Sequence, residues 1–255
     1  GNGHTDTKTV TNMVILGPVN GCDLTAGPEK SMQANGGSNY ATTRTALPIG
    51  TTNTLTICGW IKPSGTQSGN AGIAMTNAGN GGTGLNFRSN NQLGYHWNEE
   101  VGSYSWANGP TVQADVWSHV ALVVEPTKAT IYLNGAPFTR TATHVAIAFV
   151  SAFNLGNDRG TTSRTMNGEL DEFRFYNRAL TQNEIREIRH LTYPGSDPNL
   201  VAYYKFNEAS GVAYDRIGLA HANLGTGVNR VDETGPFDAG VSKRSTVTAS
   251  GASAI

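Results

Sequence analysis

Residues 117–135 read WSHVALVVEPTKATIYLNG and contain the clearest secondary-structure pattern in the chain. Apolar residues occupy every second position in 120–124, a spacing typical of a β-strand with one buried face. A Pro-Thr turn and a second β-branched run, 129–133, follow. Asn134-Gly135 then forms the dipeptide preferred in two-residue type I′ hairpin turns. The stretch therefore predicts consecutive antiparallel strands.

Similar strand patterns extend to both sides of this stretch. Further strands are expected at 54–61, 72–76, 85–88, 93–97, 146–155, 168–176 and 200–206, with weaker ones at 222–224 and 245–248. The glycine-rich segment 77–84 is expected to be a flexible loop. Thr181 followed three residues later by Glu184 is a capping box and predicts a helix at 182–190. The pattern indicates an all-β antiparallel sandwich with one short surface helix.

Composition excludes several classes of protein. The 255 residues are 38% hydrophobic and 15% charged, with 31 Gly, 10 Pro and a formal net charge of −1. This near-neutral chain lacks the basic face of a nucleic-acid-binding protein, so no nucleic-acid partner is expected. The longest apolar runs are much shorter than the roughly 18 residues of a membrane span. Cys22 and Cys58 could form one disulfide or remain two thiols.

Four blocks of sequence carry a resemblance to a known family. They are LTICGWIKP at 55–63, WSHVALVV at 117–124, ATIYLNG at 129–135, and NGELDEFRFYNRAL at 167–180 with a following Glu-Ile. In this order and spacing, they resemble the laminin-G-like jelly rolls of the concanavalin A-like lectin/glucanase superfamily, of the type found in bacterial surface proteins. The resemblance implies a jelly-roll sandwich and does not specify a ligand.

The resemblance divides the chain into three parts. Residues 1–28 are expected to be a leader or edge segment, and residues 29–198 the jelly roll. Residues 199–255 resemble the opening strand of such jelly rolls, displaced to the end. They are expected either to complete the same sandwich or to be donated to a neighbouring subunit, which would give self-association through the C-terminal strand.

Catalysis is not expected. Glucanases of this superfamily use a Glu-x-Asp-x-x-Glu strand whose carboxylates act as nucleophile and acid/base. The corresponding positions here are Glu169, Asp171 and Arg174, so the second glutamate is missing. The prediction is a protein without enzymatic activity, and a glycoside hydrolase is the least favoured alternative.

A structural calcium ion is a further expectation. Resembling jelly rolls hold Ca²⁺ with a strand-end aspartate and loop oxygens, which are the hard ligands that this ion prefers. The candidate metal ligands are Asp158, Asp171 and Asp215.

A glycan is the expected partner. Sugars are held by aromatic faces together with amide and charged groups, and these residue types gather in 95–108 and in the loop at 157–159. The predicted ligand-binding residues are Tyr95, His96, Tyr104, Trp106, Asn157 and Arg159. The functional prediction is an extracellular carbohydrate-binding or adhesion module of a bacterial surface or secreted protein. The alternative is a structural subunit of an extracellular filament assembled by strand exchange.

Overall fold

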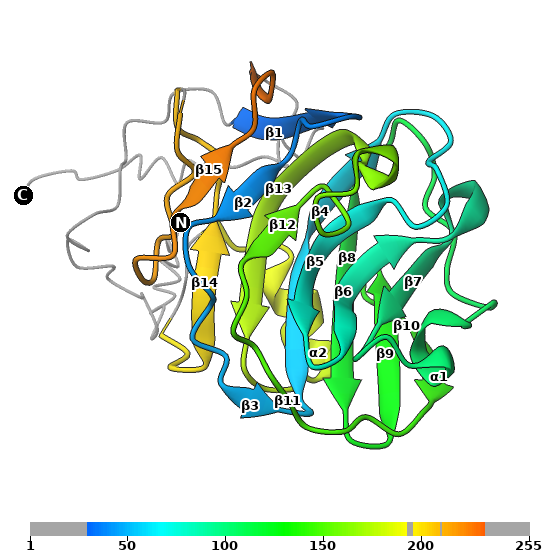
Figure 1. Ribbon diagram of the computed structural model, residues 1–255. Helices are drawn as coiled ribbons and strands as arrows, with labels where there is room; N and C mark the ends of the chain where they lie inside the picture. The colour runs from blue at the N-terminus through cyan, green and yellow to red at the C-terminus, as the bar shows by residue number, and fades with distance from the viewer. Residues whose placement is uncertain (1–29, 193–195, 210, 233–255) are drawn as a thin grey trace, which may run out of the picture.

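Two antiparallel sheets stack face to face and form a jelly-roll sandwich (Figure 1). The computed structural model describes residues 30–192, 196–209 and 211–232. Strands make up 45% of the structure and helices 9%, which confirms the all-β prediction. No helix within these residues is long and apolar enough to cross a membrane.

The larger sheet has the strand order β10-β9-β8-β4-β13-β1-β16, with β14 paired to β13 beside β1. Its strands are β1 (Lys30–Asn35), β4 (Leu55–Pro63), β8 (Ser118–Glu125), β9 (Lys128–Leu133), β10 (Ala136–Thr141), β13 (Asn167–Tyr176), β14 (Leu200–Tyr204) and β16 (Asn229–Asp232). Asn134 and Gly135 both have positive φ between β9 and β10, as expected for the predicted hairpin turn.

The smaller sheet has the order β15-β2-β12-β5-β6-β7. Its strands are β2 (Ala41–Thr43), β5 (Gly72–Ala78), β6 (Gly81–Phe87), β7 (Leu93–His96), β12 (Phe153–Leu155) and β15 (Ala222–Leu224), and β3 (Thr51–Thr52) pairs separately with β11 (Ile147–Ala148). Short helical turns are α1 (Val101–Tyr104), η1 (Ser89–Asn91) and η2 (Thr162–Arg164).

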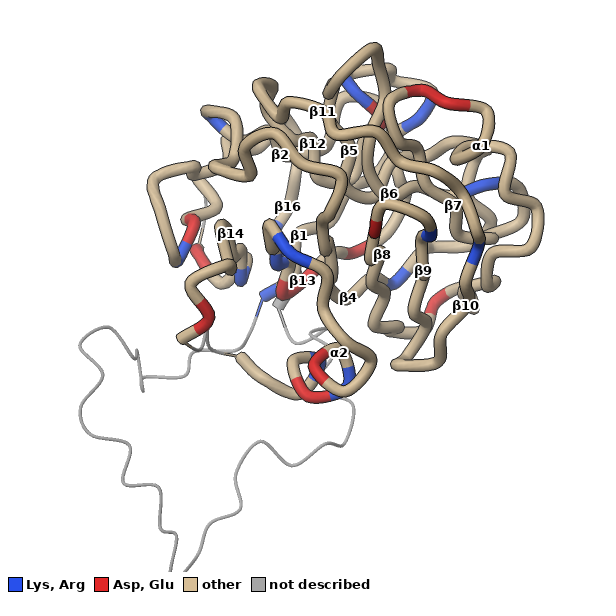
Figure 2. Tube along the Cα trace, turned by 90° about the horizontal axis from the view of Figure 1, so that it is seen from below, with Lys and Arg blue, Asp and Glu red and all other residues tan. Residues whose placement is uncertain are grey.

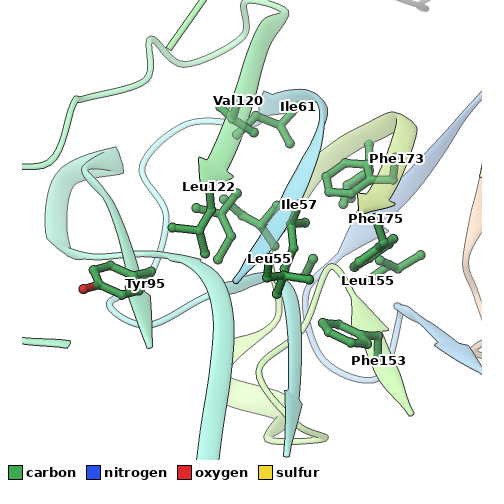
Figure 3. Close-up of a cluster of buried hydrophobic side chains, with 14 of the residues drawn as sticks. Leu55, Ile57, Ile61, Tyr95, Val120, Leu122, Phe153, Leu155, Phe173 and Phe175 are labelled. Carbon is green, nitrogen blue, oxygen red and sulfur yellow. The ribbon is translucent and has the colours of Figure 1, made fainter. Parts of the chain in front are cut away.

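The hydrophobic core lies between the sheets, as Figure 3 shows. Side chains at alternate positions of β4, β8 and β13 point to Phe153, Leu155 and Tyr95 of the smaller sheet. Phe153 contacts Phe175 edge to face, with ring centroids 4.9 Å apart. Burial of this aromatic and aliphatic surface is the main stabilising contribution to the fold.

A β-bulge in β13 controls which side chains reach the core. The pairing of β13 with β4 shifts register between Asp171 and Arg174, and Glu172 takes a positive φ of 56°. The shift turns Phe173 toward the core at the place where β4 has Gly59. A Cβ on Gly59 would lie only 2.5 Å from the Phe173 ring, so no larger residue fits there without movement.

Helix α2 (Gln182–Ile188) covers the outer face of the larger sheet (Figure 2). Its predicted capping box is confirmed, because Thr181 accepts from the Glu184 amide and Glu184 reaches back to the Thr181 amide. Gln182 donates to the Gly135 carbonyl at 3.1 Å, which joins the helix to the β9–β10 turn. Ile185 packs beneath the helix with apolar residues of the sheet.

The strand at Leu200–Tyr204 lies in the chain's own larger sheet, paired with β13. Tyr203 and Tyr204 are fully buried there. Self-association by strand exchange stays a prediction, and it would require removing both tyrosines from this environment. The segment 1–28, Cys22 and the weak strand at 245–248 lie outside the described residues.

Two local expectations were wrong. Residues 77–84 are not a flexible loop: they form the end of β5, a tight turn and the start of β6. The run 146–155 is two short strands, β11 and β12, which belong to different sheets. The glycine content of 77–84 suggested a flexible loop, but glycines of β6 are needed there because the side chain of Glu99 lies against them.

Gly59→Ala tests the close contact between the two central strands. The substitution should lower the free energy of unfolding by about 1–3 kcal/mol, because the added methyl group meets the Phe173 ring. Urea denaturation measures this change. Gly69→Ala is the matched control, since nothing lies within 4 Å of its Cβ position. Equal stabilities of the two variants would contradict the argument.

Candidate functional site

An open groove lies between β10 of the larger sheet and the segment after α1. Figure 1 shows β10 and α1 at one lateral edge of the sandwich. Its volume is about 470 Å³. The lining residues are Ser105, Trp106, Ala107, Asn108, Phe138, Thr139 and Arg140. The groove exists because β10 is the last strand of its sheet, so the side chains at this edge lack a neighbouring strand to cover them.

Strand register places the β10 side chains in the groove. Phe138 pairs with Ile131 and Arg140 with Ala129, and both partners face the core. Phe138 and Arg140 therefore point into the space between the sheets, where the core ends. Phe138 remains 38% exposed, an unusual state for a phenylalanine on the core side of a sheet.

Trp106 closes the core below the groove. This predicted ligand-binding residue is only 6% exposed, and its ring contacts Tyr95 edge to face at 5.9 Å between centroids. Arg140 donates from Nη2 to Ser105 Oγ at 3.0 Å, which joins the two sides of the groove. The groove thus combines two aromatic rings with hydroxyl, amide and guanidinium groups.

Tyr95 is not a surface residue, which corrects the prediction that it contacts a ligand. Its side chain faces the core and is fully buried, and its hydroxyl lies 2.9 Å from His144 Nε2. Burial raises the pKa of Tyr95 to about 12. Trp97 is also fully buried, as expected for a core residue.

Three other predicted ligand-binding residues gather on the outer face of the smaller sheet. His96 and Tyr104 stack with centroids 5.5 Å apart. His96 Nδ1 lies 3.6 Å from Glu99 Oε1, and Glu99 forms an ion pair with Arg159 at 3.1 Å. Burial lowers the pKa of His96, although the Glu99 charge opposes this shift.

Glycines of β6 make room for this cluster. A Cβ on Gly82 would lie 2.7 Å from Glu99 Oε2 and 2.9 Å from Arg159 Cζ. The Gly82 amide also donates to Glu99 Oε2 at 2.6 Å. The glycine-rich segment therefore lies directly against the Glu99–Arg159 ion pair and is hydrogen-bonded to it, which accounts for its regular strand structure.

Asn157 is fully buried. The prediction that it contacts a ligand was therefore wrong, and its side chain instead bonds to its own loop. Its Nδ2 donates to the Thr161 carbonyl at 2.9 Å and to Thr165 Oγ1 at 2.7 Å. The amide satisfies a buried loop that would otherwise have unpaired polar groups.

The three aspartates predicted as calcium ligands do not form one site. Asp158 is fully buried and pairs with Arg159 at 2.7 Å and Arg164 at 2.8 Å. Asp171 accepts the Glu172 amide, and Asp215 accepts the amides of residues 203, 217 and 218. No group of three or more His, Cys, Asp or Glu side chains suited to a metal occurs within the described residues.

These aspartate contacts do not fit a shared calcium ion, because arginines and amides already neutralise or occupy the carboxylate oxygens. Asp215 instead closes the loop that follows β14. A structural calcium ion stays a prediction, and these aspartates do not provide its ligand set.

β13 contains Glu169, Asp171 and Arg174, which occupy the positions of the catalytic residues of glucanases. Part of its outer face is covered by α2 and the segment that follows this helix. Glu172 and Arg174 are each 1% exposed and form an ion pair at 2.9 Å. The Tyr203 hydroxyl donates to the same carboxylate. Glu169 is joined to Lys62 at 3.1 Å and to Ser31 at 2.6 Å. No solvent-exposed pair of carboxylates from this strand is available to a substrate.

Arg174→Met tests the buried ion pair. The variant should lose about 3–5 kcal/mol of unfolding free energy, because Glu172 stays buried without its guanidinium partner. Adding Glu172→Gln should restore much of this loss. Urea denaturation of the two single variants and the double variant gives the coupling energy. Additive losses in the double variant would contradict the proposed pairing.

His119 lies in the same covered region, edge to face with Trp60 at 5.4 Å between centroids. Burial lowers its pKa to about 3, and the nearby Arg174 charge acts in the same direction. The unfolded-state pKa is about 6.5, so protonation favours the unfolded chain. The stabilising contribution of the neutral ring is therefore complete above pH 6.5 and is lost as the pH falls toward 3.

His119→Phe tests this pH dependence. Between pH 7.5 and pH 5 the wild type should lose about 2 kcal/mol more unfolding free energy than the variant, since one proton contributes about 1.36 kcal/mol per pH unit. Urea denaturation at several pH values measures both proteins. Parallel stability curves would show that His119 does not titrate in this range.

Phe138 and Arg140 are the groove residues that the sequence analysis missed. A signal was present: after the Asn134-Gly135 turn, residues 136, 138 and 140 share the core-facing side of the next strand. An alternation of Ala, Phe and Arg on that side indicates a strand whose core face is only partly covered.

Fold and groove together define the class of this protein as a jelly-roll sandwich with an open lateral groove. The chain belongs to the concanavalin A-like lectin/glucanases superfamily, whose laminin-G-like family model matches residues 35–186, more than half of the sequence. The resemblance noted in the sequence is thus confirmed. No curated protein sequence matches the chain.

Solved structures support the fold. A protein from Bacteroides ovatus ATCC 8483, described as a "putative carbohydrate binding protein", is 18% identical with a TM-score of 0.55, and the match covers 80% of this chain and 60% of that one. The native heptameric SAP-like pentraxin from Limulus polyphemus is 18% identical with a TM-score of 0.53, covering 77% and 95% of the two chains. At these identities the likeness concerns the fold.

Proposed function

We propose that this protein is an extracellular carbohydrate-binding or adhesion module that holds a glycan in the groove between Trp106 and Phe138. The observation that supports the proposal is the groove itself, which is lined by Phe138, a 38% exposed phenylalanine on the core side of β10, and by the largely buried Trp106. The Bacteroides ovatus neighbour, by its description, concerns carbohydrate binding.

Groove chemistry suits a sugar. A pyranose ring has apolar C–H faces that pack on aromatic rings, and hydroxyl groups at its rim that need hydrogen-bond partners. Phe138 provides a ring face, and Ser105, Asn108 and Arg140 provide polar groups around it. The groove is open along β10, so a chain of sugars can extend beyond it.

A non-catalytic role is part of the proposal. Hydrolysis by paired carboxylates requires two acids about 5–10 Å apart at the scissile bond. The groove lining contains no Asp, Glu or His. The acids of β13 lie under α2 and the segment after it, where Glu172 is committed to Arg174.

Phe138→Ala tests the proposal. Removing the exposed ring should weaken binding to the recognised polysaccharide about tenfold or more, because loss of an aromatic anchor costs more than about 1.4 kcal/mol. Affinity electrophoresis on gels containing different polysaccharides measures retention. Tyr214→Ala is the matched control, since Tyr214 is a 48% exposed aromatic residue outside the groove.

Trp106→Phe provides a second variant that preserves a ring in the core. It should reduce retention and lower the melting temperature less than Trp106→Ala, which would leave a larger cavity beside Tyr95. Unchanged retention of the Phe138→Ala variant on every gel that retains the wild type would exclude this groove as the glycan site.

A further inference from the structure

Arg140 is the only charged residue of the groove lining. Its guanidinium group has five N–H donors, and the hydrogen bond that it makes is from Nη2 to Ser105 Oγ at 3.0 Å. Within the described part of the chain it forms no ion pair. Glu100, whose charge acts on Tyr95 together with that of Arg140, accepts a hydrogen bond from Asn98 at 3.1 Å.

Six other described arginines differ from Arg140 in having a carboxylate partner, whereas Arg44, Arg88, Arg186 and Arg189, like Arg140, are bonded to neutral groups. Carboxylates pair with Arg159, Arg164, Arg174, Arg178, Arg216 and Arg230. Arg140 instead stands in an aromatic groove, held in place by a serine on the opposite side. A guanidinium group with unused donors is well suited to bind a planar anion through two parallel hydrogen bonds.

Strand geometry relates this cation to the aromatic ring. Phe138 and Arg140 are two residues apart on one face of β10, so their Cα atoms are about 6.8 Å apart. A sugar ring that lies on Phe138 therefore has its rim beside Arg140. A carboxylate on that rim would meet the unused N–H donors, whereas a hydroxyl would leave the positive charge uncompensated.

We propose that the groove selects acidic saccharides, with Arg140 binding the carboxylate of a uronic acid whose ring packs on Phe138. This inference rests on the proposed function of the groove and specifies its substrate class. Neutral sugars bind more weakly, because they make the ring contact without the charged one. The planar guanidinium group can donate two parallel hydrogen bonds to a carboxylate but only one to a single hydroxyl group.

The test uses matched pairs of polysaccharides that differ in charge. Affinity electrophoresis compares polygalacturonate with its methyl ester, and alginate and hyaluronan with their methyl esters, so that esterification removes the negative charge and keeps the sugar rings. Dextran sulfate and dextran form a separate pair for sulfate. The 255-residue chain and its variants are run on every gel at two salt concentrations.

Arg140→Gln should reduce retention on the preferred polyuronate at least about tenfold and leave retention on its methyl ester unchanged. Arg140→Lys should restore part of the loss, since lysine supplies the charge without the fork. Arg44→Gln is the matched control: it removes an exposed arginine that is bonded to Asn223 at 2.8 Å, away from the groove.

Each outcome decides between the proposals. Equal retention on a polyuronate and its ester, or equal losses for Arg140→Gln and Arg44→Gln, would overturn acid selection while glycan binding stands. Preference for dextran sulfate without preference for any polyuronate would replace the carboxylate by sulfate and overturn the inference. No retention on any gel, or no effect of Phe138→Ala on the retention observed, would overturn the groove function itself.

Discussion

The close approach of Gly59 to Phe173 is the contact on which this sandwich depends. β4 and β13 form the centre of the larger sheet, and the bulge at Glu172 shifts the side chains that follow it by one position. Phe173 and Phe175 thereby enter the core, where Phe175 meets Phe153 of the smaller sheet. A side chain at position 59 would clash with the Phe173 ring. The glycine is therefore required both for the β4–β13 register and for the packing of Phe173 in the core.

The same bulge explains the polar chemistry beneath α2. Because Phe173 points inward, its neighbours Glu172 and Arg174 lie on the outer side of the sheet, where they are buried and need partners. Arg174 forms an ion pair with Glu172 and lies over the Tyr203 ring, whose hydroxyl donates to Glu172. The helix and the segment after it then cover a strand that in glucanases faces a substrate. The groove in which we propose that a glycan binds lies on another part of the surface, beside β10.

Periodicity predicted most strands and the capping box predicted α2, because both signals are local. Side-chain exposure was less predictable. Tyr95 and Asn157 have residue types suited to sugars, but the inward face of β7 and the closure of a loop bury them. Trp106 lines the groove but is itself largely buried, so its contact with a ligand stays a prediction. Its partner Phe138 was missed, since the exposure of a core-facing residue depends on which strand ends the sheet, and pairing between distant segments decides that.

The pairing of β1 with β16 has a mechanical consequence. Lys30 lies opposite Asp232 in this antiparallel pair, at the far end of the strand order from β10. At about 4.8 Å per strand spacing, β10 lies five spacings (roughly 24 Å) from Lys30 of β1 and six spacings (roughly 29 Å) from Asp232 of β16. Tension applied through Lys30 and Asp232 would break the β1–β16 hydrogen bonds one after another, because the two residues lie at the same end of the ladder. The first strands to separate would be those most distant from a ligand bound beside β10.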